Sequence, residues 1–148
     1  MARIVKTITI AAEGRDKGKT FILTEMPPRV GHKWATRALF AMLNSGADIP
    51  DNVMSSGMAG IAMMGGRALT LIPAEAAEPL LEQLLDGIRI NYEPTKSHME
   101  RDINDSDIEE IATLFLLQKE VFLMHTEPFT KGVKSTSVST PEQAATPS

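Results

Sequence analysis

The sequence lacks cysteine, an excess of basic residues and any long uninterrupted apolar run. Without cysteine the chain forms no disulfide, thiolate nucleophile, iron–sulfur cluster or Cys-based zinc site. Its 15 Lys and Arg are scattered and outnumbered by 19 Asp and Glu, which argues against a nucleic-acid partner. The most apolar segment, residues 53–72, contains Arg67 and four glycines and is a poor membrane span. We therefore expect no membrane partner and a cytoplasmic location.

The residues that are present, 43% of them hydrophobic in a chain of 148, suffice for the core of one domain. Residues 3–10 and 20–25 are rich in β-branched side chains and flank a Gly-containing loop, which predicts an antiparallel hairpin. The sequence leaves open whether residues 89–93 add a third short strand. Apolar residues recur at helical spacing in four further segments, residues 28–45, 53–69, 73–88 and 106–124.

These elements predict an α+β fold, with the N-terminal β-hairpin packed on about four α-helices. We expect a single globular domain over residues 1–125. The segment 126–148 is rich in Ser, Thr and Pro and has no apolar periodicity, which predicts a disordered polar tail. Within 53–69, small residues such as Gly60 would let another helix approach closely, and Gly65 and Gly66 should end or bend this helix.

Several patterns come close to a chemical site without completing one. Residues 14–20 read GRDKGKT, but Glu13 stands where a phosphate-binding loop needs its first glycine, and a strand follows instead of a helix. We therefore interpret this segment as a hairpin loop. The histidines His32, His98 and His125 show no metal-ligand spacing. The sequence thus predicts no catalytic, metal-binding or cofactor-binding residue, and a protein that is not an enzyme.

A cluster of carboxylates lies between residues 102 and 110. It lacks the central glycine of a calcium-binding loop. Ser106 and Glu109 have the spacing of a capping box, which predicts that the last helix starts here. Negative charge at the N-terminus of a helix is favourable, so this cluster needs no ligand to explain it.

The last helix carries more apolar surface than one buried face requires. A helix that is apolar on two sides is either sandwiched inside its own domain or shared with another chain, and the sequence leaves both open. We expect the first stripe to face the core: Ile108, Ile111, Ala112, Phe115, Phe122 and Leu123. The predicted partner-binding residues are the second stripe, Leu114, Leu117, Val121 and Met124, with Phe40, Phe115 and Phe129 as further anchors.

The order and spacing of several segments resemble the tail assembly chaperones of long-tailed bacteriophages. The similarity covers residues 3–125 and leaves only the tail outside it. The individual motifs carry no diagnostic chemistry, so the resemblance rests on their order along the chain. The segments are KGKTFILTEMPP, HKWATRALFAMLNSG, MAGIAMMGGRAL, AEPLLEQLLDGI and DIEEIATLFLLQKEVFLMH.

This resemblance implies a protein of the host cell cytoplasm that binds and solubilises the tape measure protein and helps recruit tail tube subunits during tail morphogenesis. It implies no catalytic residue and no cofactor. It also leaves room for self-association, or for association with a longer form made by ribosomal frameshifting near the end of the chain. Two other interpretations stay open: a small structural tail or neck completion protein of the virion, and a bacterial adaptor or binding module.

Overall fold

The computed structural model describes residues 3–93, 95–96 and 98–139, with the side chains of 66 and 131–139 excepted. The contacts within the chain group it into two compact units. Unit 1 combines Met1–Pro28 with Pro79–Phe122, and unit 2 combines Arg29–Glu78 with Leu123–Ser148. The single domain expected over residues 1–125 stays a prediction.

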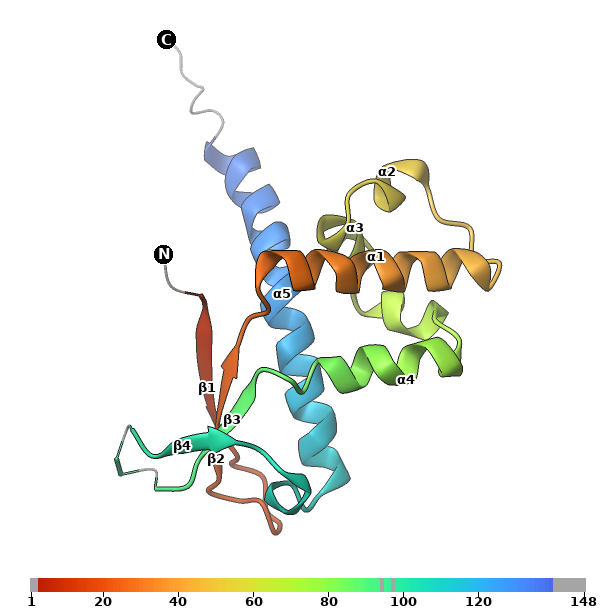
Figure 1. The fold of residues 1–148 in the computed structure, drawn as a ribbon. Helices are drawn as coiled ribbons and strands as arrows, with labels where there is room; N and C mark the ends of the chain where they lie inside the picture. Colours follow the sequence, from red (N-terminus) through yellow and green to blue (C-terminus); the bar gives the residue numbers. More distant parts are fainter. Residues whose placement is uncertain (1–2, 94, 97, 140–148) are drawn as a thin grey trace. The chain divides into compact units, whose positions relative to one another are not determined.

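Unit 1 contains one antiparallel sheet in the order β1-β2-β3-β4 (Figure 1). Its strands are β1 (Val5–Thr9), β2 (Thr20–Thr24), β3 (Ile88–Asn91) and β4 (Glu100–Asp102). The predicted hairpin is confirmed, since β1 pairs with β2 across the loop that contains residues 14–19, and Thr20 begins β2. The third strand left open by the sequence joins this sheet as β3. Strand β4 was not predicted, because three polar residues in a charged segment carry no β signal of their own.

The two faces of this sheet differ in polarity. Phe21 pairs with Ile90 and Leu23 with Ile88, and all four side chains are buried on one face. The other face carries Thr7, Thr9, Thr20 and Asn91, with the buried Ile22 as an apolar residue among them. This alternation follows from the two-residue period of a β-strand, and the apolar face forms the core of unit 1.

Helix α5 (Ile111–Ser139) begins in unit 1 and is longer than predicted. Lys6 of β1 forms an ion pair with Glu120 at 2.6 Å, and the Gln118 side-chain amide donates to the carbonyl of Leu81 at 3.1 Å. These contacts tie the first half of α5 to β1 and to helix α4 (Ala74–Gln83).

Helix α5 continues through residues 126–139, past its expected end at residue 124 and into the segment expected as a polar tail. Residues 140–148, the rest of the expected tail, lie outside the described residues. The physical reason is that elongating an existing helix costs far less than starting one, so polar residues extend it without apolar periodicity. The fold class is confirmed as α+β.

Unit 2 is built around helix α1 (Pro28–Asn44), which buries Trp34, Ala38 and Met42 on one face as its apolar spacing predicts. The segment expected as one helix over residues 53–69 is instead three short helices, α2 (Asp51–Met54), α3 (Met58–Met64) and η1 (Gly65–Leu71).

Glycines explain these breaks and the close packing beside them. Gly57 and Gly65 both have positive φ values, +56° and +67°, which interrupt a right-handed helix. A Cβ atom at Gly60 would collide with the carbonyl oxygen of Val53. The close approach that small residues predicted is therefore confirmed between α3 and α2.

Candidate functional site

The first turns of helix α5 expose large apolar side chains to solvent. Ile111 is 86% exposed and Phe115 is 69% exposed. These two residues are four apart and so lie on one face of the helix, with the half-buried Leu114 beside them. We call Ile111, Leu114 and Phe115 the α5 patch. Exposed apolar side chains that adjoin one another are a feature of protein interaction sites.

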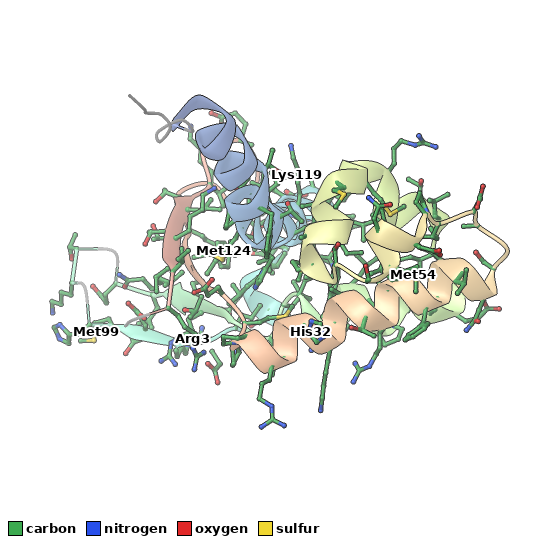
Figure 2. The ribbon with its side chains drawn as sticks, turned by 90° about the horizontal axis from the view of Figure 1, so that it is seen from above. Arg3, His32, Met54, Met99, Lys119 and Met124 are labelled. Atoms are coloured by element: carbon green, nitrogen blue, oxygen red, sulfur yellow. The ribbon has the colours of Figure 1, made fainter. Side chains whose placement is uncertain are left out.

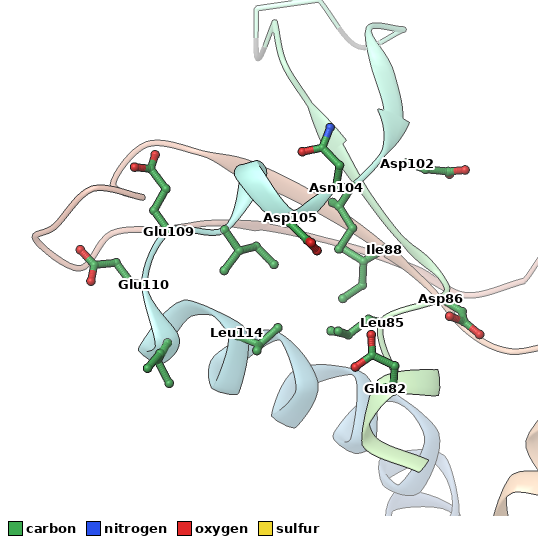
Figure 3. Close-up of a pocket in the computed structure, with 13 residues that line it drawn as sticks. Glu82, Leu85, Asp86, Ile88, Asp102, Asn104, Asp105, Glu109, Glu110 and Leu114 are labelled. Atoms are coloured by element: carbon green, nitrogen blue, oxygen red, sulfur yellow. The ribbon is translucent and has the colours of Figure 1, made fainter. Parts of the chain in front are cut away.

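A pocket of about 560 Å³ adjoins this patch within unit 1. Figure 3 shows the side chains of Leu85, Ile88 and Leu114 facing one another in the middle of the pocket. The six apolar residues that line it are Leu85, Ile88, Ile103, Ile108, Ile111 and Leu114. Among these, Ile88 is buried and the other five keep exposed surface, so the floor of the pocket is accessible.

The rim of the pocket is acidic. Of its 13 lining residues, six carry carboxylates and none is basic: Glu82, Asp86, Asp102, Asp105, Glu109 and Glu110. Figure 3 shows Glu82 and Asp86 at one end and Glu109 and Glu110 at the other.

The two ends differ in how their charge is neutralised. Glu109 pairs with Lys19 at 3.0 Å and Glu110 pairs with Arg15 at 3.2 Å. Asp102 lies 3.5 Å from the guanidinium of Arg89. The other three carboxylates, Glu82, Asp86 and Asp105, have no basic partner in the part of the chain that the structure describes.

The loop between β1 and β2 holds the start of helix α5 in place through Asp16. This carboxylate is 1% exposed and accepts hydrogen bonds from the backbone N–H groups of Glu109, at 3.0 and 3.1 Å, and Glu110, at 2.9 Å. The ammonium of Lys19 donates to Asp16 at 2.8 Å and to the backbone carbonyl of Asp107 at 2.9 Å. We call Arg15, Asp16 and Lys19, together with residues 107–110 that they bind, the loop clamp.

The loop clamp is ionic at neutral pH. Burial acts to raise the pKa of Asp16, but hydrogen bonds from Lys19, from Thr113 and from the two backbone N–H groups outweigh it and leave that pKa well below its ordinary value. Burial acts to lower the pKa of Lys19, and its hydrogen bonds to Asp16 and Glu109 outweigh that effect and leave the pKa raised. Hydrogen bonds from Arg15 lower the pKa of Glu110.

A second ion pair holds the segment between β4 and α5, from which residues 103–105 and 108–110 line the pocket. Both terminal nitrogens of Arg101 donate to the carboxylate of Asp107 at 2.7 Å, and this pairing lowers the pKa of Asp107. Asp107 also accepts from the backbone N–H of Asn104 at 2.7 Å, while the Asn104 side chain accepts from the N–H of Ser106 at 3.0 Å.

The capping box predicted from Ser106 and Glu109 is therefore wrong in register. The box joins Asn104 and Asp107 at a short 3-10 helix, η2 (Asp105–Asp107), and α5 starts four residues further on. Asparagine caps as well as serine does, and the Arg101 pair holds Asp107 in this position.

The predicted partner-binding stripe on the last helix is mostly buried. Leu117, Val121 and Met124 are buried, so the expectation that they form an exposed stripe is wrong. Leu114 is half-buried at the pocket. The first stripe, expected to face the core, instead exposes Ile111, Ala112 and Phe115, whereas Phe122 is buried. Helical periodicity separates two apolar faces but does not say which one points inward.

The other predicted anchors lie in unit 2. Phe40 is 52% exposed on α1 and Phe129 is 42% exposed on α5, as partner contact requires, and their binding role stays a prediction. His32 lies on α1 (Figure 2), with its ring against Gly57. Among the described residues, no group of His, Asp and Glu side chains has the arrangement of a metal site.

No protein-family model matches the chain, and no curated protein and no solved structure matches it. Within the described residues, no helix has both the length and the apolar character that crossing a membrane requires. The α5 patch, the pocket beside it and the sequence resemblance are the features that bear on function.

Proposed function

We propose that this protein is a tail assembly chaperone of a long-tailed bacteriophage. In this role it binds and solubilises the tape measure protein in the host cell cytoplasm and helps recruit tail tube subunits during tail morphogenesis. The resemblance of residues 3–125 to that family supports the proposal. The observation that carries it is the exposure of Ile111 and Phe115 on the first turns of α5. The proposal assigns the chain no catalytic residue and no cofactor.

A long helical client presents stripes of apolar side chains that would aggregate in water. The α5 patch offers such a stripe an apolar surface, and helix recognition of this kind uses residues spaced three and four apart. Burying a large apolar side chain contributes about 1.5–3 kcal/mol, so two such side chains give a weak contact. Weak contacts repeated along a long client would keep it soluble and still allow the chaperone to leave when tube subunits arrive.

Co-expression with the candidate tape measure protein tests this function. We expect the full-length chain to raise the soluble fraction of the tape measure protein and to co-purify with it. The double variant Ile111→Asp, Phe115→Asp should remain folded, because both side chains are exposed, and should lose both effects.

The matched control is Met63→Asp, which places the same charge on another exposed apolar residue, 58% exposed in unit 2. It should behave as the unmodified chain does. If the tape measure protein stays insoluble with the unmodified chain, the proposed function is wrong. Purified virions should lack the protein, and finding it there by mass spectrometry would favour a structural tail or neck component.

A further inference from the structure

We propose that the pocket beside the α5 patch takes a cationic amphipathic helix, with a bulky apolar side chain in the hollow and Lys or Arg residues toward Glu82, Asp86 and Asp105. The identification of this helix as a segment of the tape measure protein rests on the proposed function. The chemistry of the occupant does not, because it follows from the lining of the pocket.

The hollow is suited to an apolar side chain. Leu85, Ile103, Ile108 and Leu114 each keep part of their surface exposed, and Ile111 adds an almost fully exposed side chain at the edge. The volume of about 560 Å³ lies within the range of about 300–1,000 Å³ that binding pockets commonly have. An apolar group entering it would cover several apolar side chains at once, which a flat surface does not offer.

The charges around the hollow define the sign of the partner. Glu109 and Glu110 already have Lys19 and Arg15 as partners, so that end gains little from another cation. Glu82, Asp86 and Asp105 lack such partners within the described residues, and no basic side chain lines the pocket. A partner with cationic groups toward Glu82 and Asp86 therefore meets complementary charge, while an acidic partner meets repulsion.

This asymmetry also orients the occupant. Figure 3 places Glu82 and Asp86 at the end away from the loop clamp, with the apolar side chains of Leu85 and Leu114 between the two ends. Basic residues of the bound helix, about one turn from its apolar anchor and on one side of it, would reach Glu82 and Asp86, which have no basic partner among the described residues.

Two synthetic helical peptides test the proposal with the full-length chain. Both contain leucine at the same helical spacing, and the remaining positions are lysine in one and glutamate in the other. With a fluorescent label on the peptide, anisotropy should show binding of the lysine peptide and at least about tenfold weaker binding of the glutamate peptide. Raising the salt concentration should weaken binding of the lysine peptide.

Variants locate the binding in the pocket. The triple variant Glu82→Gln, Asp86→Asn, Asp105→Asn should bind the lysine peptide about tenfold more weakly, because three exposed ion pairs of modest strength are lost together. The matched control replaces the exposed acids Asp48→Asn, Glu75→Gln and Glu93→Gln, which changes the net charge equally. The control should bind the lysine peptide within about twofold of the unmodified chain.

Equal binding of the two peptides would overturn the proposal. An equal loss of affinity for the lysine peptide in the pocket variant and in the control variant would also overturn it. Co-expression separates this inference from the proposed function. If the tape measure protein stays soluble with the pocket variant as with the unmodified chain, the function stands and the pocket assignment is wrong. If the unmodified chain fails to solubilise it while the peptide preference and its loss in the pocket variant hold, the function is wrong and the chemistry of the pocket is supported.

Discussion

Replacing Asp16 with alanine removes the carboxylate that connects the β1–β2 loop to the start of helix α5. The backbone N–H groups of Glu109 and Glu110 would lose their acceptor, and the Lys19 ammonium would lose its most buried partner. The loop clamp is assembled from segments that lie more than 90 residues apart in the sequence, since Glu109 comes 93 positions after Asp16. Its loss should therefore destabilise the tertiary structure of unit 1 and not a single helix alone.

The size of the effect follows from the contacts. Losing a helix cap costs about 0.5–2 kcal/mol, and removing one member of a buried ion pair costs about 3–5 kcal/mol. Lys19 keeps Glu109 and the carbonyl of Asp107 as partners, so the cost of Asp16→Ala should lie toward the lower end of the range for a buried ion pair. We expect a loss of about 3 kcal/mol in the free energy of unfolding, a large share of the roughly 5–15 kcal/mol typical of a domain. Asp16→Asn keeps one oxygen acceptor and should lose less.

Urea unfolding followed by far-UV circular dichroism measures this loss, and Trp34 fluorescence follows unit 2 separately. Glu13→Ala is the control, because Glu13 is an exposed neighbour that pairs only with Lys17 among the described residues. The control should change the free energy of unfolding by less than about 0.5 kcal/mol. A loss below about 1 kcal/mol for Asp16→Ala would refute the role given to the loop clamp.

Three further predictions concern pH, close packing and the two faces of α5. Because the pKa values of Asp16 and Asp107 are lowered in the folded state, their stabilisation is present above the unfolded pKa of about 4 and is lost as the pH falls below it. The urea concentration at the midpoint of unfolding should therefore fall as the pH is lowered from 7 to 3, and it should fall less in the variant Asp16→Ala. Gly60→Ala should destabilise unit 2 by about 1–3 kcal/mol, measured by Trp34 fluorescence, because its Cβ has no room. In urea unfolding, Leu117→Asp should lower the free energy of unfolding by about 3–5 kcal/mol and Phe115→Asp by less than about 1 kcal/mol, because Leu117 is buried and Phe115 is exposed. Equal losses in the two variants would contradict the burial pattern of α5.

The elements that depend on local pattern could be predicted from the sequence. Alternating β-branched residues predicted the β1–β2 hairpin, and the helical spacing of apolar residues around Trp34 predicted helix α1. Strand β4 could not be predicted, because Glu100–Asp102 is extended only through its pairing with β3. The breaks at Gly57 and Gly65 were only partly signalled, since glycine permits a positive φ without requiring it.

The candidate site depends on contacts that no local pattern contains. Its lining comes from the end of α4 and the turn into β3, from the end of β4 and the segment after it, and from the first turns of α5. Asp16 carries no sequence signal for capping a helix that begins more than 90 residues later. The two apolar stripes of α5 were recognised, but not which residues of each are buried, because burial depends on what packs against the helix.

Hydrogen–deuterium exchange of the full-length chain, with and without its tape measure protein, tests the central claim most directly. If the α5 patch and the pocket bind the client, the client should slow exchange in residues 82–88 and 102–118. The same client should protect these residues less in the variant Ile111→Asp, Phe115→Asp. Protection confined to other segments, such as helix α1, or no protection at all, would contradict the account.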